Sequence, residues 1–429
     1  MFGFANFLLL ALFAAAVFDL IFALARGSGL RGALHGLWNT PHLLFGQQLA
    51  EWRLQLGRIL FAAGLAAYEI SVVFCNSMAR QNWAWVQGVM SPVLEWLAFL
   101  CFGAKILFGT RYTWRELLAG GALYFIARWV YFNSQNIWWI GIVVAVLAAK
   151  DVPLRRPLQV YFASGCAAMA VVLALHFAGI VAPDLTSERM GALRGTYGYG
   201  HPNTFGGLVF GLVLAYALLR AQKVRWVDCL LVFAVGVFLL VGPASRSAAL
   251  CTLALAVELV FCRLRAGHSV PRWWPGTCAG MVGLTAAVSY LLPLLVIKVG
   301  PWNNDIGPAW LAKLDSLLTC RISLTWMAYR LLDVKIAGQV FNWPTVDNSF
   351  AFALFQFGPV VAALLGILFA AALWGHAKQG RRVEVCCLFA MLAYAYMEVQ
   401  PFHLTTNPTA LLLCGAVFAQ ASARWQKIE

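Results

Sequence analysis

Long apolar runs, separated by short polar connections, occupy almost the whole chain. The runs are continuous rather than alternating with polar residues, and many approach the ~20 residues that a helix needs to cross a bilayer. This pattern predicts an all-α polytopic membrane protein with about twelve or thirteen transmembrane helices. The expected spans cover residues 4–25, 58–76, 93–109, 117–133, 136–150, 158–182, 204–220, 226–242, 247–262, 276–297, 350–374, 383–397 and 408–424.

Two of the long connections are residues 183–203 and 298–349. Residues 310–318 and 322–332 have helical periodicity, so we expect the second connection to carry short helices. We also expect two regions along the chain. Residues 1–182 form an N-terminal group of transmembrane helices, and residues 183–429 form a C-terminal transmembrane region that contains both long connections and, as the motifs below indicate, the catalytic residues.

Charged residues are scarce and unevenly placed. Of 429 residues, 62% are hydrophobic and 11% are charged, whereas a soluble domain has about 25% charged residues. The positive-inside rule makes the connections rich in Lys and Arg cytoplasmic, which leaves 183–203, 298–349 and 398–407 outside. The formal net charge of +14 therefore reflects topology and suits anionic lipid, and it does not indicate a nucleic-acid partner. The basic clusters lie within residues 26–58, 105–115, 150–156, 220–225, 263–272, 378–382 and 424–427.

The eleven cysteines show no metal-binding spacing. Most of them fall inside apolar runs, where cysteine behaves as a small apolar packing residue. No Cys-x-x-Cys pair or His-Glu-x-x-His motif occurs, so we expect no metal and no other cofactor. The first apolar run lacks a basic leading region and a clear cleavage site, so we interpret it as a retained span rather than a signal peptide.

Polar residues gather near the span ends that the charge rule places outside. Taken singly, each has a simple explanation. Asn203 or Thr204 can cap the helix that follows, Asp347 can cap a helix that begins near residue 349, and a loop arginine can contact lipid headgroups. Taken together, the arginines suit a multiply charged anion, because the guanidinium group matches the geometry of phosphate. The set comprises Arg194, Tyr199, His201, Asn203, Ser245, Arg246, Arg321, Asp347, Asn348, Glu398, His403 and Asn407, with Arg128 near the outer end of the fourth span.

Four stretches of this region resemble successive blocks of bacterial Wzy-type polysaccharide repeat-unit polymerases, members of the O-antigen polymerase/ligase superfamily. The stretches are RGTYGYGHPNTFG (194–206), LDSLLTCRISLTWMAYR (314–330), TVDNSFAFALFQFG (345–358) and MEVQPFHLTTNPTALLL (397–413). The first half of the chain resembles the family in hydropathy alone. One departure is Thr319-Cys320-Arg321, which stands where the family has Ser-Gly-Arg and lacks the glycine that favours a tight turn.

The resemblance implies a GT-C-like glycosyltransferase in the cytoplasmic (inner) membrane of a bacterium, with its active site facing outside. Its donor is an oligosaccharide repeat unit on undecaprenyl pyrophosphate, and its product is exopolysaccharide, capsule or O-antigen. The expected partners are this lipid-linked oligosaccharide, membrane lipids, a chain-length regulator and a flippase.

The resemblance also implies roles for the polar residues. Arg194, Arg246 and Arg321 neutralise the charge that develops on the departing pyrophosphate. Asp347, Glu398 or His201 removes the proton of the acceptor hydroxyl, and Asp347 is preferred. The catalytic residues expected on this basis are Arg194, His201, Arg321, Asp347 and Glu398. The expected substrate contacts are Arg128, Tyr199, Asn203, Arg246, Asn348 and Asn407.

Two other functions remain open at this point. A ligase of the same superfamily transfers finished glycan to a lipid or wall acceptor with the same donor chemistry. A polysaccharide transporter or flippase belongs to a different class, in which related halves and charges near the bilayer midplane are common. The sequence shows no internal repeat, which favours an enzyme over a transporter.

Overall fold

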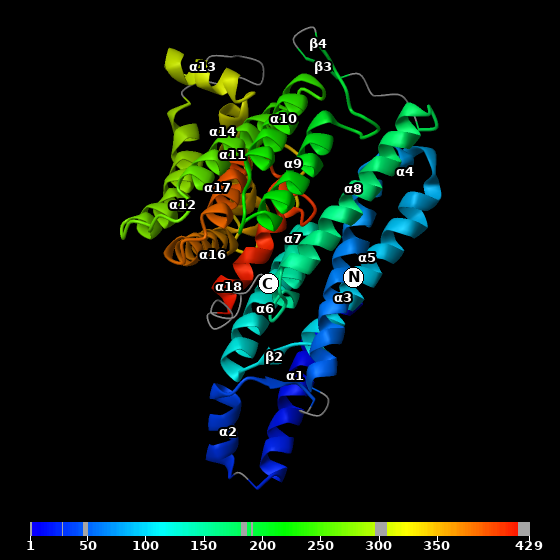
Figure 1. The fold of residues 1–429 in the computed structure, drawn as a ribbon, viewed down its shortest axis with the longest axis vertical. Helices are drawn as coiled ribbons and strands as arrows, with labels where there is room; N and C mark the ends of the chain where they lie inside the picture. The colour runs from blue at the N-terminus through cyan, green and yellow to red at the C-terminus, as the bar shows by residue number, and fades with distance from the viewer. Residues whose placement is uncertain are drawn as a thin grey trace. The chain divides into compact units, whose positions relative to one another are not determined.

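The structure is a computed structural model that describes residues 2–27, 29–45, 50–181, 187–189, 192–296 and 307–418. These residues are mostly helical (Figure 1). Eight of the described helices are long and apolar enough to cross a membrane, as expected of an all-α multi-pass membrane protein. These eight segments are Asn6–Ala25, Glu51–Cys75, Val86–Phe108, Arg155–Phe177, Pro202–Leu219, Arg246–Leu264, Trp274–Leu295 and Pro359–Lys378. Shorter apolar helices are Ile137–Ala148, Trp226–Val241 and Pro408–Val417.

The chain divides into two compact units that alternate along the sequence. Unit 1 contains Met1–Arg128, Trp139–Leu208 and Ala410–Glu429, and unit 2 contains Trp129–Trp138 and Val209–Thr409. The helices of the first half are α1 (Phe2–Ala25), α2 (Leu30–Asn39), α3 (Ala50–Cys75), α4 (Ala79–Asn82), α5 (Ser91–Phe108), α6 (Trp114–Ser134), α7 (Ile137–Ala148), α8 (Arg155–Phe177) and α9 (Pro202–Leu219). The later helices are α10 (Trp226–Val241), α11 (Arg246–Leu264), α12 (Trp274–Leu291), α13 (Ala309–Leu317), α14 (Arg321–Leu331), α15 (Ser349–Phe352), α16 (Pro359–Lys378), α17 (Arg382–Met397) and α18 (Cys414–Val417).

Two short antiparallel strand pairs accompany the helices. Strand β1 (His42–Leu43) pairs with β2 (Arg111–Tyr112), and β3 (Ser187–Arg189) pairs with β4 (Ala192–Arg194). The second pair leads directly into the polar stretch that precedes α9.

Close helix packing forms the core of unit 1, where α3 packs against α5 and α8 (Figure 1). A Cβ atom added to Gly57 of α3 would lie 2.8 Å from the Cα atom of Gly109, just beyond α5. A Cβ atom added to Gly64 would lie 2.7 Å from the ring of Phe102. Small residues at these positions therefore set the distance between the two helices, as is common between membrane helices.

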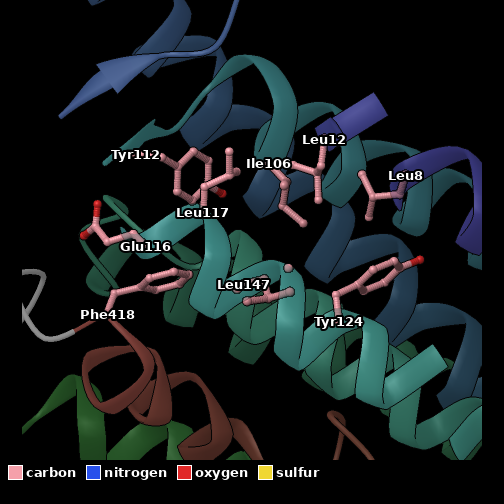
Figure 2. Close-up of a pocket in the computed structure, with 11 residues that line it drawn as sticks. Leu8, Leu12, Ile106, Tyr112, Glu116, Leu117, Tyr124, Leu147 and Phe418 are labelled. Carbon is pink, nitrogen blue, oxygen red and sulfur yellow. The ribbon is translucent and has the colours of Figure 1, made fainter. Parts of the chain in front are cut away.

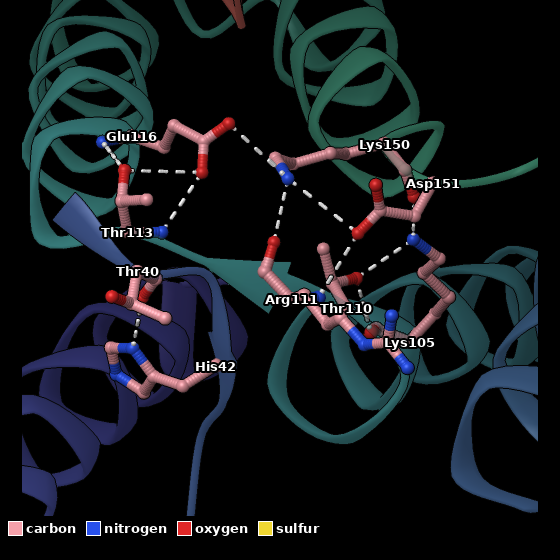
Figure 3. A network of polar contacts seen from close by, with 9 residues as sticks. All are labelled: Thr40, His42, Lys105, Thr110, Arg111, Thr113, Glu116, Lys150 and Asp151. Carbon is pink, nitrogen blue, oxygen red and sulfur yellow. Dashed lines mark hydrogen bonds and ion pairs between the residues drawn. The ribbon is translucent and has the colours of Figure 1, made fainter. Parts of the chain in front are cut away.

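A network of buried charges lies at the end of unit 1 where α5 ends and α6 begins (Figure 3). Lys150 Nζ lies 3.3 Å from Glu116 Oε1 and donates a hydrogen bond of 2.6 Å to the main-chain oxygen of Arg111. Lys105 donates a hydrogen bond to the main-chain oxygen of Lys150. Both lysines are buried and both have partners, as a buried charge requires. The network joins two of the basic clusters that the charge rule places on one side of the membrane.

Helix pairs also build unit 2, in which α11 packs against α10 and α17 and α12 packs against α16. A Cβ atom on Gly236 of α10 would lie 2.7 Å from the side chain of Leu253, so this glycine permits the close α10–α11 contact. A buried apolar cluster joins α14 to the segment around α15. Its members are Ala328, Val346, Ala351 and Phe355.

The expected span over residues 350–374 is confirmed from residue 359 onward, where α16 is long and apolar enough to cross a membrane, but its start is wrong. The segment contains the short helix α15, a π-helical turn (Ala353–Phe357) and then the separate helix α16. Gly358 interrupts the helix with a φ of 89°, and a Cβ atom at this position would lie 2.1 Å from the main-chain oxygen of Ile336. Pro359 then begins α16, as proline favours the first turn of a helix.

The other expected elements agree with the structure to different degrees. Helices α13 and α14 begin and end one residue before the predicted ranges 310–318 and 322–332. Helices α6 and α17 occupy two further predicted spans but are not among the eight long apolar helices. The last predicted span begins as a 3-10 helix (Pro408–Leu413) followed by α18. Residues 419–424 of that prediction, and parts of 183–203 and 298–349, lie outside the described residues.

Candidate functional site

The predicted site residues of unit 2 lie at the opposite helix ends from its basic clusters. Helix α11 runs from Arg246 to the basic residues around Arg263, and α17 runs from Arg382 to its end before Glu398. At the basic end, Arg382 donates to the main-chain oxygen of Arg265, which ties the start of α17 to the end of α11. Glu398 therefore lies beside the start of α11, at the end that the charge rule assigns to the outside.

A buried ion pair forms the centre of the candidate site. Arg321 Nη2 lies 2.5 Å from Glu398 Oε1, and both side chains are buried. The pair connects the first residue of α14 with the residue that follows α17. Removing one partner of such a pair costs about 3–5 kcal/mol, because the other charge is left buried without compensation.

The remaining donors of Arg321 are also used. Its Nη1 atom donates to the main-chain oxygen of Leu318 at 2.9 Å and to Thr319 Oγ1 at 3.0 Å. Its Nε atom donates to the main-chain oxygen of Met397, and Nη2 lies 3.4 Å from Ser247 Oγ. The guanidinium plane is therefore fixed by three segments of the chain, a geometry that a lysine ammonium does not reproduce.

The turn before Arg321 forms without the glycine that the polymerase family has there. Thr319 and Cys320 both adopt the left-handed conformation, with φ values of 62° and 63°. Asp315 stabilises this conformation, because its Oδ1 atom accepts hydrogen bonds from the main-chain nitrogens of Ile322 (2.7 Å) and Ser323 (3.2 Å). Asp315 is completely buried and takes the place of a helix cap for α14.

Hydrogen bonds fix both the side chain and the main chain of Glu398. Ser247 Oγ donates to Glu398 Oε1 at 2.9 Å, and Ser349 Oγ donates to the Glu398 main-chain oxygen at 2.5 Å. Burial raises the pKa of the Glu398 carboxyl to about 7, and the negative charge of Asp347 adds to the rise, while Arg321 opposes it. Glu398 consequently exchanges a proton near neutral pH, and Asp347 lies close enough to influence it.

Asn348, rather than Asp347, caps the helix that begins at residue 349, so the simple alternative for Asp347 does not hold. Asn348 Oδ1 accepts hydrogen bonds from the main-chain nitrogens of Phe350 (2.9 Å) and Ala351 (3.1 Å). The Asn348 amide also donates to Ser289 Oγ of α12 at 3.1 Å. These contacts make Asn348 a buried structural residue and leave the half-buried Asp347 beside the ion pair.

Two further predicted residues of unit 2 differ in exposure. Arg246 is exposed at the start of α11, next to Ser247. Asn407 is buried, donates to the main-chain oxygen of Pro401 at 2.9 Å and accepts from Thr409 Oγ1 at 2.5 Å. Arg246 is thus placed to meet a ligand, whereas Asn407 fixes the loop after α17.

In unit 1, the structure brings together Arg194 and Asn203. Arg194 Nη2 donates to Asn203 Oδ1 at 2.9 Å, and the arginine side chain is buried. Asn203 therefore orients the arginine and does not cap α9, contrary to expectation. The cap is His201, whose Nδ1 atom accepts a hydrogen bond of 3.1 Å from the main-chain nitrogen of Asn203. His201 itself is exposed.

Tyr199 and Arg128 have structural environments in unit 1. Tyr199 is completely buried, forms a β-bridge with Ser77 and packs against the ring of Phe205. Arg128 of α6 donates through Nε to Asn6 Oδ1 of α1 at 2.7 Å. The contacts of Tyr199 therefore stabilise the polar stretch before α9, and Arg128 links α6 to α1.

Two cavities of unit 1 lie among other residues. One has a volume of about 10 Å³ and is lined mostly by apolar side chains of α1, α5, α6 and α7, together with Tyr112, Glu116 and Phe418 (Figure 2). The other, about 370 Å³, lies between α1 and α2 and is lined by Asp19, Arg26 and His42 among others. None of the candidate residues that were identified from the sequence lines either of these two cavities.

Three residues of the unit 2 site were not identified from the sequence: Ser247, Asp315 and Ser349. The only sequence signal for Ser247 and Ser349 is their position next to Arg246 and Asn348. Asp315 stands within the second motif block, six residues before Arg321.

As arranged, the unit 2 site offers a fixed guanidinium, a carboxyl that titrates near neutrality and a second carboxylate, which together suit an anion and a proton transfer. Within the described ranges, no group of three or more His, Cys, Asp or Glu side chains is placed to hold a metal ion. Comparison with protein-family models, curated proteins and solved structures gave no match for this chain.

Proposed function

We propose that the chain is a polymerase that joins undecaprenyl-pyrophosphate-linked oligosaccharide repeat units at the outer face of a bacterial cytoplasmic membrane. The product is exopolysaccharide, capsule or O-antigen. The observation that supports this most is the buried Arg321–Glu398 pair, because its members come from two of the four motif blocks. The third block contributes Asp347 and Ser349 to the same place.

Donor binding uses Arg321 and its exposed neighbour in the site, Arg246. The pyrophosphate of the donor competes with the Glu398 carboxylate for the guanidinium of Arg321. Protonation of Glu398 removes its negative charge and so favours the exchange. The fixed orientation of Arg321 then presents the N–H groups of Nη2, released from Glu398, to one phosphate group.

The transfer breaks one bond and forms one. A hydroxyl oxygen of the acceptor repeat unit attacks the anomeric carbon of the donor sugar. The bond between that carbon and the pyrophosphate oxygen breaks, and its electron pair leaves on undecaprenyl pyrophosphate. Asp347 accepts the hydroxyl proton, and Arg321 and Arg246 stabilise the leaving group, each contributing about 3 kcal/mol in the transition state if it acts as a preorganised donor.

The polar stretch of unit 1 is a separate candidate anion contact in this proposal. Arg194 is oriented by Asn203 at the start of α9, so it offers a further guanidinium to a phosphate or to an acidic sugar. His201 holds the start of that helix.

The test uses purified protein in liposomes with one lipid-linked repeat unit as the sole substrate. A polymerase gives a ladder of products, each one repeat unit longer, with one undecaprenyl pyrophosphate released for each new linkage. Transfer that occurs only after a lipid core or wall acceptor is added identifies a ligase. Movement of the substrate across the bilayer without a new glycosidic bond identifies a transporter, and either result overturns the proposal.

A further inference from the structure

We propose that Cys262 and Cys386 form a redox-active dithiol, which reacts with low-molecular-weight disulfides to give a cross-link between α11 and α17. The two Sγ atoms lie 3.4 Å apart, although the residues are 124 positions apart in the sequence. This inference rests on the geometry of unit 2 alone and does not depend on the proposed polymerase activity.

The separation of the sulfur atoms is what distinguishes these cysteines from packing residues. A disulfide bond is about 2.05 Å long, so the two sulfurs have to approach by roughly 1.4 Å. Helices α11 and α17 pack directly against each other, so rotation of the two side chains can supply this movement. A cysteine that only fills apolar space does not need a second sulfur within van der Waals distance.

The partial exposure of the two cysteines also favours their reaction with a small disulfide. Cys262 and Cys386 are partly exposed, whereas the neighbouring Cys387 is completely buried. Cys262 lies in the last turn of α11, and Cys386 lies near the start of α17. A small reagent can therefore reach the pair from the end of the helices without crossing the core.

Charged side chains lie near the pair at this end. Arg382 at the start of α17, Glu258 on α11 and Glu384 on α17 all interact electrostatically with Cys262. Arg382 joins the two helix ends through the main-chain oxygens of Arg265 and His268. The positive charge of Arg382 favours the thiolate, which is the nucleophile in disulfide exchange, while the ionised form of either glutamate opposes it.

The exchange proceeds in two balanced steps. One thiol loses its proton, and the thiolate attacks a small disulfide RS–SR, which forms a mixed disulfide and releases RS⁻. The second protein thiolate then attacks the protein sulfur of the mixed disulfide and releases the second RS⁻. Overall, two protein thiols and RS–SR give the protein disulfide and two RSH, so the protein is oxidised and the small disulfide is reduced.

The experiment treats the purified full-length protein in detergent with glutathione disulfide, blocks the remaining thiols and identifies disulfide-linked peptides by mass spectrometry. We expect a Cys262–Cys386 link within one chain that dithiothreitol reverses. Cys262→Ser and Cys386→Ser should each abolish the link. The matched control Cys387→Ser changes the adjacent residue and should leave it intact.

Several results would overturn the inference. One is that the exposed Cys320 reacts with glutathione disulfide while Cys262 and Cys386 remain as thiols. Another is that the link forms through Cys387, or only between two chains. The circular dichroism spectrum of each serine variant shows whether the variant is folded, so loss of the link is not confused with loss of structure.

Discussion

The same carboxylate oxygen of Glu398 accepts hydrogen bonds from Arg321 and Ser247. Arg321 Nη2 lies 2.5 Å from this oxygen, and Ser247 Oγ lies 2.9 Å from it. An anionic ligand that takes the guanidinium of Arg321 therefore has to replace a carboxylate that is already bound. In the proposed function, the ion pair is therefore a closed form of the anion site, and protonation of Glu398 favours its opening.

The first prediction concerns pH. Burial raises the pKa of Glu398 to about 7, and the donor-bound state favours the protonated carboxyl, so binding takes up a proton above that pKa. Donor affinity is then constant below pH 7 and falls as the pH rises above about 7, by up to about tenfold per pH unit. The KM for the lipid-linked donor, measured from pH 6 to pH 9, tests this.

The matched variant for this experiment is Glu398→Gln, which retains the shape and a hydrogen-bond acceptor but cannot ionise. Its donor KM should be nearly independent of pH across the same range. A Glu398→Gln enzyme that keeps the wild-type pH profile would show that another group controls donor binding.

The second prediction concerns Asp315, which caps α14 from within the preceding helix. Asp315→Ala leaves two main-chain nitrogens without their acceptor and should destabilise the α13–α14 segment by about 1–3 kcal/mol. Limited proteolysis should then cut this segment faster, and polymer yield should fall. The exposed Asp333 provides the control, since Asp333→Ala should change neither measurement. Equal proteolysis rates for the two variants would show that Asp315 does not stabilise the α13–α14 segment.

The third prediction concerns His201, a candidate base in the sequence and a helix cap in the structure. Asparagine is among the best capping residues and alanine is poor. His201→Asn should therefore retain most activity, and His201→Ala should lose more. Near-complete loss of activity in both variants, with normal amounts of protein in the membrane, would instead support a role as the base.

The fourth prediction concerns orientation. In a background without native cysteines, Thr345→Cys should react with a membrane-impermeant maleimide on intact cells, and Lys223→Cys should not. Both positions are exposed in the structure, so accessibility alone does not separate them. Labelling of residue 223 alone would place the Arg321–Glu398 site on the cytoplasmic side.

Hydrophobic pattern and periodicity predicted most helices of the fold. They located α13 and α14 to within one residue, because apolar positions at helical spacing are a local property of the sequence. They missed the break at Gly358, because apolar residues continue on both sides of it. The glycine is required by a contact with Ile336, which local sequence does not reveal.

Only some residues of the candidate site were predictable from the sequence, and their pairings were not. Arg321 and Glu398 were both identified, yet their ion pair depends on how α14 and α17 meet. For the capping roles of His201 and Asn348, the sequence suggested neighbours one to three positions away, because several adjacent residues were chemically able to cap. Asp315 had no signal of its own, since an aspartate in a surface helix is ordinary until its partners are known.

The most direct test of the central claim compares wild-type protein with Arg321→Lys and Arg330→Lys, both on α14, in liposomes with a lipid-linked repeat unit. The measurement is the rate of undecaprenyl pyrophosphate release coupled to glycan elongation. We expect Arg321→Lys to lose at least about tenfold in rate, or ~1.4 kcal/mol, because lysine keeps the charge but loses the planar donor set. The exposed Arg330→Lys variant should match the wild type. Equal rates for all three proteins, at equal amounts in the membrane, would contradict the assignment of Arg321 to the donor pyrophosphate.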